Sequence, residues 1–164
     1  MKKQLYRIVT GILVLAWMCL IFSFSSQPAT ESSKVSGGLC HRLVEQTNEV
    51  LHLDMTETQQ LSIAEKIEYP VRKAAHMTEY AILGLLSFAF YRGISGKEKR
   101  QFLAALITSA VYACTDEFHQ LFVPGRSGQF TDVCIDTIGA CIGMLIIFLI
   151  RKIIYCRNKK SMLS

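Results

Sequence analysis

The residues best suited to chemistry lie between Thr115 and Asp136, close together in an otherwise apolar part of the chain. A histidine beside a carboxylate can act as a general acid or base, and a guanidinium binds phosphate or carboxylate groups through paired N–H donors. Ionisable groups in or beside a membrane span cost roughly 2.5–3.5 kcal/mol each to insert, so their density here predicts a functional site. The polar residues concerned are Asp116, Glu117, His119, Gln120, Arg126, Asp132 and Asp136.

The elements that must position these residues are long apolar helices. The chain has 164 residues, of which 51% are hydrophobic, and its mean hydropathy is +0.29. A helix needs about 17–25 residues to cross a hydrocarbon core about 30 Å thick. Four stretches satisfy this requirement, at about 5–24, 71–91, 102–121 and 131–153. We therefore expect an all-α, polytopic membrane protein with four transmembrane helices and a single domain over 1–164.

The distribution of basic residues orients these spans, because Lys and Arg accumulate on the cytoplasmic side of a membrane. A cytoplasmic N-terminus predicts a cytoplasmic C-terminus after four passes. That side then holds twelve of the 18 Lys and Arg residues: Lys2, Lys3, Arg7, Arg92, Lys97, Lys99, Arg100, Arg151, Lys152, Arg157, Lys159 and Lys160. We interpret these basic segments as topology signals that contact anionic lipid, and not as a nucleic-acid-binding surface.

The segment 25–70 is predicted to be an excursion outside the membrane, with too few large apolar residues to form a core of its own. Apolar residues at helical spacing indicate short amphipathic helices between the first and second spans. Thr56 and Gln59 have the spacing of a capping box before the second of them. Pro70 suits the first turn of the following helix, because its missing N–H costs nothing there.

A polar stripe is expected at the start of the second span. At 100° per residue, Arg72, Lys73, His76, Glu79 and Tyr80 fall within an arc of about 120°. Glu79 would lie roughly 13 Å below Pro70, too deep to be a surface charge. We therefore expect Glu79 to be paired, with Lys73, Arg72 or Arg126 as its candidate partners.

The third span places Asp116, His119 and Gln120 within an arc of about 100°, whereas Glu117 points about 100° away from Asp116, towards water or another helix. Residues 123–128 then predict a tight turn, since Pro-Gly favours chain reversal. This turn holds Arg126 at the mouth of the expected site.

The fourth span carries Asp132 and Asp136 on the same face as Gly139 and Gly143, within an arc of about 60°. Glycines four residues apart allow a neighbouring helix backbone to approach closely. We expect the glycines to pack against another helix, and the two acids above them to meet the polar stripes of the second and third spans.

Three blocks of this sequence resemble the VanZ-like membrane protein family, which is associated with low-level resistance to the glycopeptide teicoplanin. They span 72–84, 115–127 and 131–143, and the strongest parts are Asp-Glu-Phe-His-Gln at 116–120 and Val-Pro-Gly-Arg-Ser at 123–127. The resemblance covers roughly residues 5–150. It implies a multi-pass protein of the bacterial cell membrane, and it implies no particular reaction.

Two hypotheses follow for the function. In the first, a pocket at the outer leaflet binds an anionic phospholipid or a lipid-linked envelope precursor, with Arg126, Lys73 and Arg72 contacting phosphate. In the second, the same cluster forms an enzyme that transfers or hydrolyses a group on such a lipid, with His76, Asp116, His119 and Asp132 as catalytic candidates. The expected binding residues are Arg72, Lys73, His76, Glu79, Tyr80, Asp116, Glu117, His119, Gln120, Arg126, Ser127, Asp132 and Asp136.

A metal site is a weaker alternative. The cluster includes enough nitrogen and oxygen ligands for zinc or a harder ion, with His76 and His119 as the imidazole ligands. The sequence contains no His-Glu-x-x-His spacing, and the neighbouring basic residues would repel a cation. We therefore expect no metal and no cofactor. The sequence indicates no oligomeric state.

Overall fold

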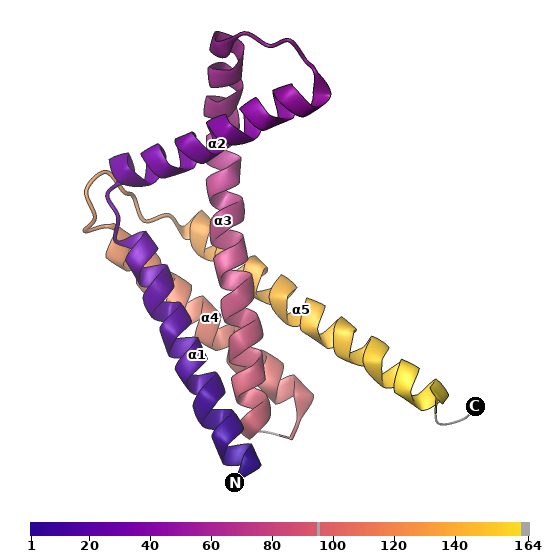
Figure 1. The fold of residues 1–164 in the computed structure, drawn as a ribbon. Coiled ribbons are helices and arrows are strands. Elements are labelled where there is room, and N and C mark those ends of the chain that lie inside the picture. Colours follow the sequence, from indigo (N-terminus) through magenta and orange to yellow (C-terminus); the bar gives the residue numbers. More distant parts are fainter. Residues whose placement is uncertain (95, 162–164) are drawn as a thin grey trace.

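A computed structural model describes residues 1–94 and 96–161, which form five α-helices and no strand. The helices are α1 (Lys2–Ser25), α2 (Ala29–Leu51), α3 (Glu57–Ile94), α4 (Glu98–Gln120) and α5 (Phe130–Ser161). The predicted all-α class is therefore confirmed. α3 is the hub of the fold, since it packs against each of the other four helices (Figure 1).

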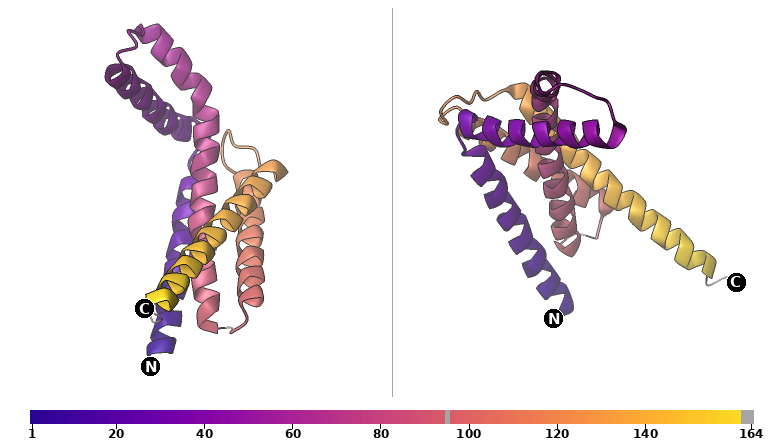
Figure 2. Two further views of the ribbon diagram at one scale, coloured as in Figure 1. Left: turned by 90° about the vertical axis from the view of Figure 1, so that its right-hand side faces the viewer. Right: turned by 45° about the horizontal axis from the view of Figure 1, so that its top comes forward.

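The helix α3 is longer than a membrane is thick. Its 38 residues extend over about 57 Å at 1.5 Å per residue, against a hydrocarbon core of about 30 Å. Its first turns pair with α2 in a helical hairpin that projects beyond the other helices (Figure 2). Cys40, Val44 and Ala64 form the small buried core of this hairpin.

Pro70 lies inside α3, so the prediction that a helix begins there was wrong. The capping box was predicted correctly: Thr56 N donates to Gln59 Oε1 at 2.9 Å, and Gln59 N donates to Thr56 Oγ1 at 3.4 Å. From this start the helix continues past Pro70, although the proline removes one backbone hydrogen bond. Ile67 and Val71, on either side of Pro70, both pack against the hairpin core, and this packing offsets the lost bond.

α3 and α5 cross in close contact through small residues. A Cβ atom at Gly139 would collide with the backbone of Met77, one at Gly143 with the backbone of Ala81, and one at Gly84 with the backbone of Ala140. The predicted close approach at the two α5 glycines is therefore confirmed. Beyond this crossing, Arg151 of α5 forms an ion pair with Glu98 at the start of α4, and the last turns of α5 extend away from the other helices (Figure 1).

Among the described residues, two segments are long and apolar enough to cross a membrane by length and composition, Lys2–Ser25 and Phe130–Asn158. They contain the predicted first and fourth spans. The predicted second and third spans lie within α3 and α4, and the arrangement of four passes stays a prediction.

Candidate functional site

A cavity of about 270 Å³ opens between the C-terminal end of α1, the first turns of α2, α3 and the loop that joins α4 to α5. Its charged and ionisable members are four of the residues expected from the sequence, and the rest of its wall is largely apolar. The lining residues are Phe24, Gln27, Ser32, Val35, Ser36, Leu39, Val71, Arg72, Ala75, His76, Glu79 and Arg126. The cavity therefore combines a charged region with a hydrophobic wall.

Arg126 reaches this cavity from the predicted turn. Arg126 N donates to Val123 O at 3.1 Å, and Gly125 has a φ of 74°, a conformation that glycine adopts without strain at the third position of a type II turn. The Arg126 Nε atom donates to Gln27 O at 3.2 Å, which ties the loop to the connection between α1 and α2. Partial burial and, next, the neighbouring Arg72 cation lower the pKa of Arg126 from its ordinary value.

Arg72 has its ionic partner, Glu68, on the side of α3 that faces α2. Its Nη1 atom lies 3.8 Å from Glu68 Oε1 and 3.4 Å from the Ser33 hydroxyl, while Ser36 donates to the same Glu68 oxygen at 2.8 Å. Glu68 was not among the candidate residues. Its spacing of four residues from Arg72 on one helix could have identified it.

Among the described residues Glu79 forms no ion pair with Lys73, Arg72 or Arg126, so the expected pairing was wrong. Its nearest basic neighbour is His76, which would form an ion pair only when protonated. His76 Nδ1 lies 3.6 Å from Glu79 Oε2, beyond hydrogen-bond distance. Glu79 Oε2 is buried and has no hydrogen-bond partner among the described residues. The main chain at this point is fixed by Trp17, whose Nε1 donates to Glu79 O at 2.8 Å.

Lys73 and Asp132 form an ion pair that joins α3 to α5. Both side chains are largely buried, at 17% and 18% exposure. Neither residue lines the cavity. The expected phosphate contact of Lys73 is therefore replaced by a contact between helices.

Asp116 and Gln120 lie on α4, and Gln120 contacts the last residue of α1. Gln120 Nε2 lies 3.0 Å from Ser25 Oγ and 3.3 Å from Asp116 Oδ2. Asp116 is only 2% exposed, and its Oδ1 atom has no partner among the described residues. Sequence reasoning missed Ser25, because it falls in the segment 25–70, which was interpreted as an excursion outside the membrane.

Two more candidates, Tyr80 and Asp136, are fully buried inside the bundle. Tyr80 is 0% exposed and Asp136 is 1% exposed. The hydroxyl of Tyr80 and the Oδ1 atom of Asp136 have no hydrogen-bond partner in the described part of the chain. Neither residue lines the cavity.

Glu117 is also buried, so of the two expected alternatives, water or another helix, it does not face water. Its Oε2 atom accepts a hydrogen bond at 2.8 Å from the backbone amide of Gln129, directly before α5. Ser127 is exposed and accepts a hydrogen bond from the Gln129 side chain. Glu117 therefore supports the loop and does not line the cavity.

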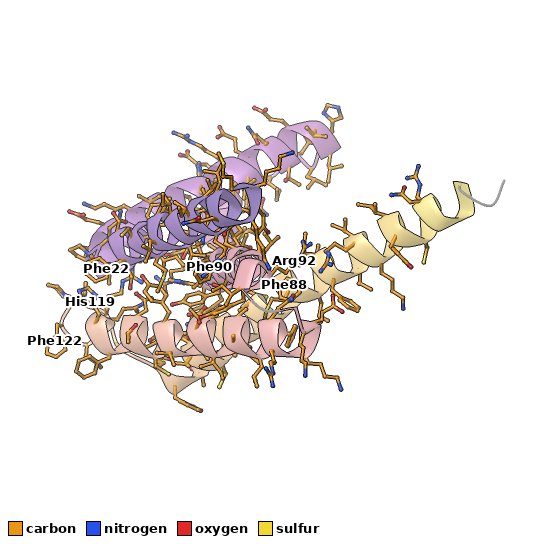
Figure 3. All side chains as sticks on the ribbon, turned by 90° about the horizontal axis from the view of Figure 1, so that it is seen from below. Phe22, Phe88, Phe90, Arg92, His119 and Phe122 are labelled. Atoms are coloured by element: carbon orange, nitrogen blue, oxygen red, sulfur yellow. The ribbon has the colours of Figure 1, made fainter. Side chains whose placement is uncertain are left out.

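His119 lies outside the cavity, although it shares a helix face with Asp116 and Gln120. Its ring packs against Phe22 of α1, with ring centroids 4.5 Å apart and an interplanar angle of 47° (Figure 3). Its Nδ1 atom is buried without a hydrogen-bond partner in the described residues. The structure therefore separates the two histidines that the sequence placed in one site.

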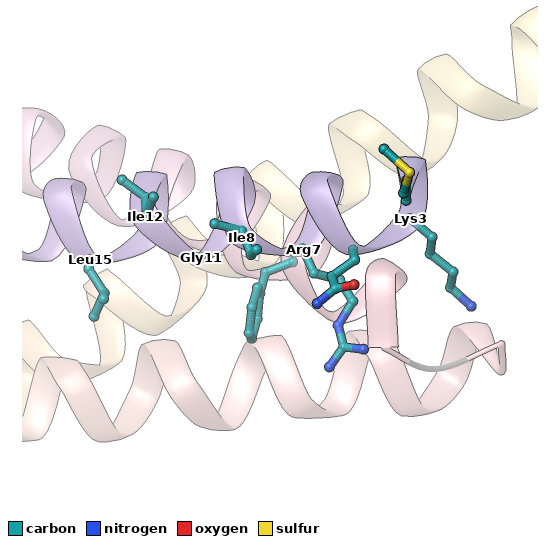
Figure 4. Close-up of a pocket in the computed structure, with 9 residues that line it drawn as sticks. Lys3, Arg7, Ile8, Gly11, Ile12 and Leu15 are labelled. Atoms are coloured by element: carbon teal, nitrogen blue, oxygen red, sulfur yellow. The ribbon is translucent and has the colours of Figure 1, made fainter.

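Over residues 1–94 and 96–161, no three His, Cys, Asp or Glu side chains form a group that could hold a metal ion. A second, wider hollow of about 720 Å³ lies at the other end of α1, beside Lys3, Arg7, Gly11 and Phe90 (Figure 4). None of the candidate residues from the sequence lines it. The cavity of about 270 Å³ is thus the place where four of the predicted residues meet, Arg72, His76, Glu79 and Arg126.

A family model described as VanZ/LLP1 matches residues 10–151 of the chain. No match was found among curated proteins or among solved structures. The matched region includes α3, α4 and the cavity-lining residues Arg72, His76, Glu79 and Arg126.

Proposed function

Because the chain belongs to the VanZ/LLP1 family, we propose that it is an integral membrane protein of the bacterial envelope that binds an anionic lipid at the outer leaflet. The lipid is a phospholipid or a lipid-linked cell-wall precursor. By occupying or presenting such lipids, the protein alters susceptibility to glycopeptides of the teicoplanin type.

In this proposal α1, α3, α4 and α5 cross the membrane, with both termini in the cytoplasm. The basic residues at the ends of the spans support this orientation. The length of α3 supports it too, since a helix of 38 residues can cross the bilayer and still extend into the hairpin with α2. The cavity then lies at the outer membrane surface, below the hairpin.

The observation that carries the proposal is the meeting of Arg72 and Arg126 at a partly apolar cavity. Among the described residues, the hydrogen-bond acceptor of Arg126 is a backbone carbonyl, that of Gln27, and burial, followed by repulsion from the neighbouring Arg72 cation, lowers the pKa of Arg126. A phosphate group would relieve this repulsion and accept charge-assisted hydrogen bonds from both guanidinium groups. The apolar wall suits the part of a lipid next to its headgroup.

Native mass spectrometry of the purified chain with phosphatidylglycerol tests this proposal. We expect Arg126→Met and Arg72→Met each to weaken retention of the lipid about tenfold, as expected for loss of a hydrogen bond to a charged group. Arg100→Met, at the exposed start of α4, is the matched control and should retain the lipid. Unchanged retention in both cavity variants would contradict the proposal.

A second candidate function is catalysis on the same lipid, and the proximity of His76 to Glu79 in the cavity favours it. A histidine close to a carboxylate can act as a general base in hydrolysis or transfer. Thin-layer chromatography of envelope lipids incubated with the protein should then show a product that His76→Gln abolishes. If the lipids stay intact while a control enzyme converts its substrate in the same assay, catalysis is contradicted and binding remains the proposed function.

A further inference from the structure

The cavity presents an acid beside its two guanidinium groups. Glu79 lines it together with Arg72 and Arg126, and Glu79 Oε2 is buried without a hydrogen-bond partner among the described residues. A buried carboxylate oxygen that lacks a donor is costly. A bare phosphate would satisfy the guanidinium groups, but it would leave Glu79 unpaired and add a second negative charge next to it.

We propose that the ligand is a phospholipid whose headgroup carries a hydrogen-bond donor, a hydroxyl or an ammonium group, in addition to its phosphate. Arg126 and Arg72 hold the phosphate, and the Glu79 carboxylate accepts the donor. This inference rests on the proposed lipid-binding function and specifies which headgroups the cavity selects.

The apolar wall identifies the source of the phosphate as a lipid and not a free phosphate ester. Phe24, Val35 and Leu39 line the cavity and are also exposed, at 46%, 70% and 52%. Val35 and Leu39 lie one helical turn apart on α2, and Leu43, which continues their stripe, is exposed as well. Acyl chains beside this surface would cover the residues that a water-soluble ligand would leave in contact with water.

Two lipids of equal charge separate the contribution of the donor from that of the phosphate. Phosphatidylglycerol and phosphatidylmethanol each carry one phosphodiester charge, but only the glycerol headgroup has hydroxyl donors. With the full chain in nanodiscs, we expect phosphatidylglycerol to bind about tenfold more tightly, as expected for one hydrogen bond to a carboxylate. Soluble glycerol phosphate should bind far more weakly than either lipid.

Glu79→Met should abolish the preference by weakening phosphatidylglycerol binding while leaving phosphatidylmethanol binding intact. Glu45→Met removes a carboxylate from the exposed surface of α2 and should keep the preference. Thermal unfolding of each variant checks that it is folded. If the wild-type chain binds the two lipids equally, the headgroup inference is overturned, although lipid binding stands. If it binds neither lipid, or if Arg126→Met has no effect on either, the proposed function itself fails.

Discussion

Lys73 of α3 forms an ion pair with Asp132 of α5, which removes one cation and one acid from the group that the sequence assigned to ligand binding. The same two helices approach each other closely at Gly139 and Gly143 of α5. Arg72 and Arg126 are the basic residues that line the cavity. The polar cluster is thus divided between contacts that hold the helices together and contacts open to a ligand.

We predict that Lys73→Met lowers the free energy of unfolding by about 2 kcal/mol, because it leaves Asp132 largely buried without its partner. The double variant Lys73→Met with Asp132→Leu should recover most of this loss, since no uncompensated charge remains. Unfolding by denaturant in detergent micelles measures both values. Equal losses in the single and double variants would show that the ion pair does not couple the two helices.

A second prediction concerns the glycines of α5 at the same helix crossing. Gly143→Ala places a Cβ atom against the backbone of Ala81 and should destabilise the protein by about 1–3 kcal/mol. Gly38→Ala is the matched control, because nothing lies within 4 Å of a Cβ atom at this position of α2. Alanine there should be neutral or stabilising by up to about 1 kcal/mol. The same unfolding measurement distinguishes the two positions.

Cys40 tests the packing of the hairpin. The residue is fully buried between α2 and α3, and burial, with a further contribution from the Glu68 carboxylate, raises the pKa of its thiol. Less thiolate is then present near pH 7.5, and alkylation accelerates only at a pH above the usual range for cysteine. We expect maleimide to label Cys40 much more slowly than the exposed Cys156. Equal rates in the folded protein would contradict a packed hairpin.

The four-pass arrangement can be tested at two exposed loop positions, in a variant whose native cysteines are replaced. A membrane-impermeant thiol reagent added to intact cells should label Ser127→Cys, between α4 and α5, and should not label Gly96→Cys, between α3 and α4. Permeabilised cells provide the control, in which both positions react. Labelling of Gly96→Cys in intact cells would show that the proposed orientation is wrong.

Local signals were sufficient to predict several features of this fold. The capping box at Thr56 and Gln59 and the turn around Gly125 depend on hydrogen bonds and backbone conformations within a few residues. The close approach at Gly139 and Gly143 follows from the absence of a side chain. Helical periodicity was also correct in bringing Arg72, His76 and Glu79 to one cavity.

The missed features depend on which helix packs against each residue. The periodicity of one helix does not show which other helix that is. His119 shares a helix face with Asp116, but its ring packs against Phe22 of α1. Glu79 shares a stripe with Lys73, but Asp132 of α5 pairs with that lysine. Pro70 does not begin a helix, because the α2–α3 hairpin core packs against α3 on both sides of it.

The most direct test of lipid binding at the cavity lined by Arg72 and Arg126 is site-specific photo-crosslinking in vesicles that contain equal amounts of phosphatidylglycerol and phosphatidylcholine. Benzoylphenylalanine replaces Leu39, which lines the cavity, or Ile107, an exposed control position on α4. Mass spectrometry then identifies the attached lipids. We predict that phosphatidylglycerol is enriched in the Leu39 adducts relative to the Ile107 adducts, and that Arg126→Met removes the enrichment. The same lipid ratio at both positions would contradict an anionic-lipid site in this cavity.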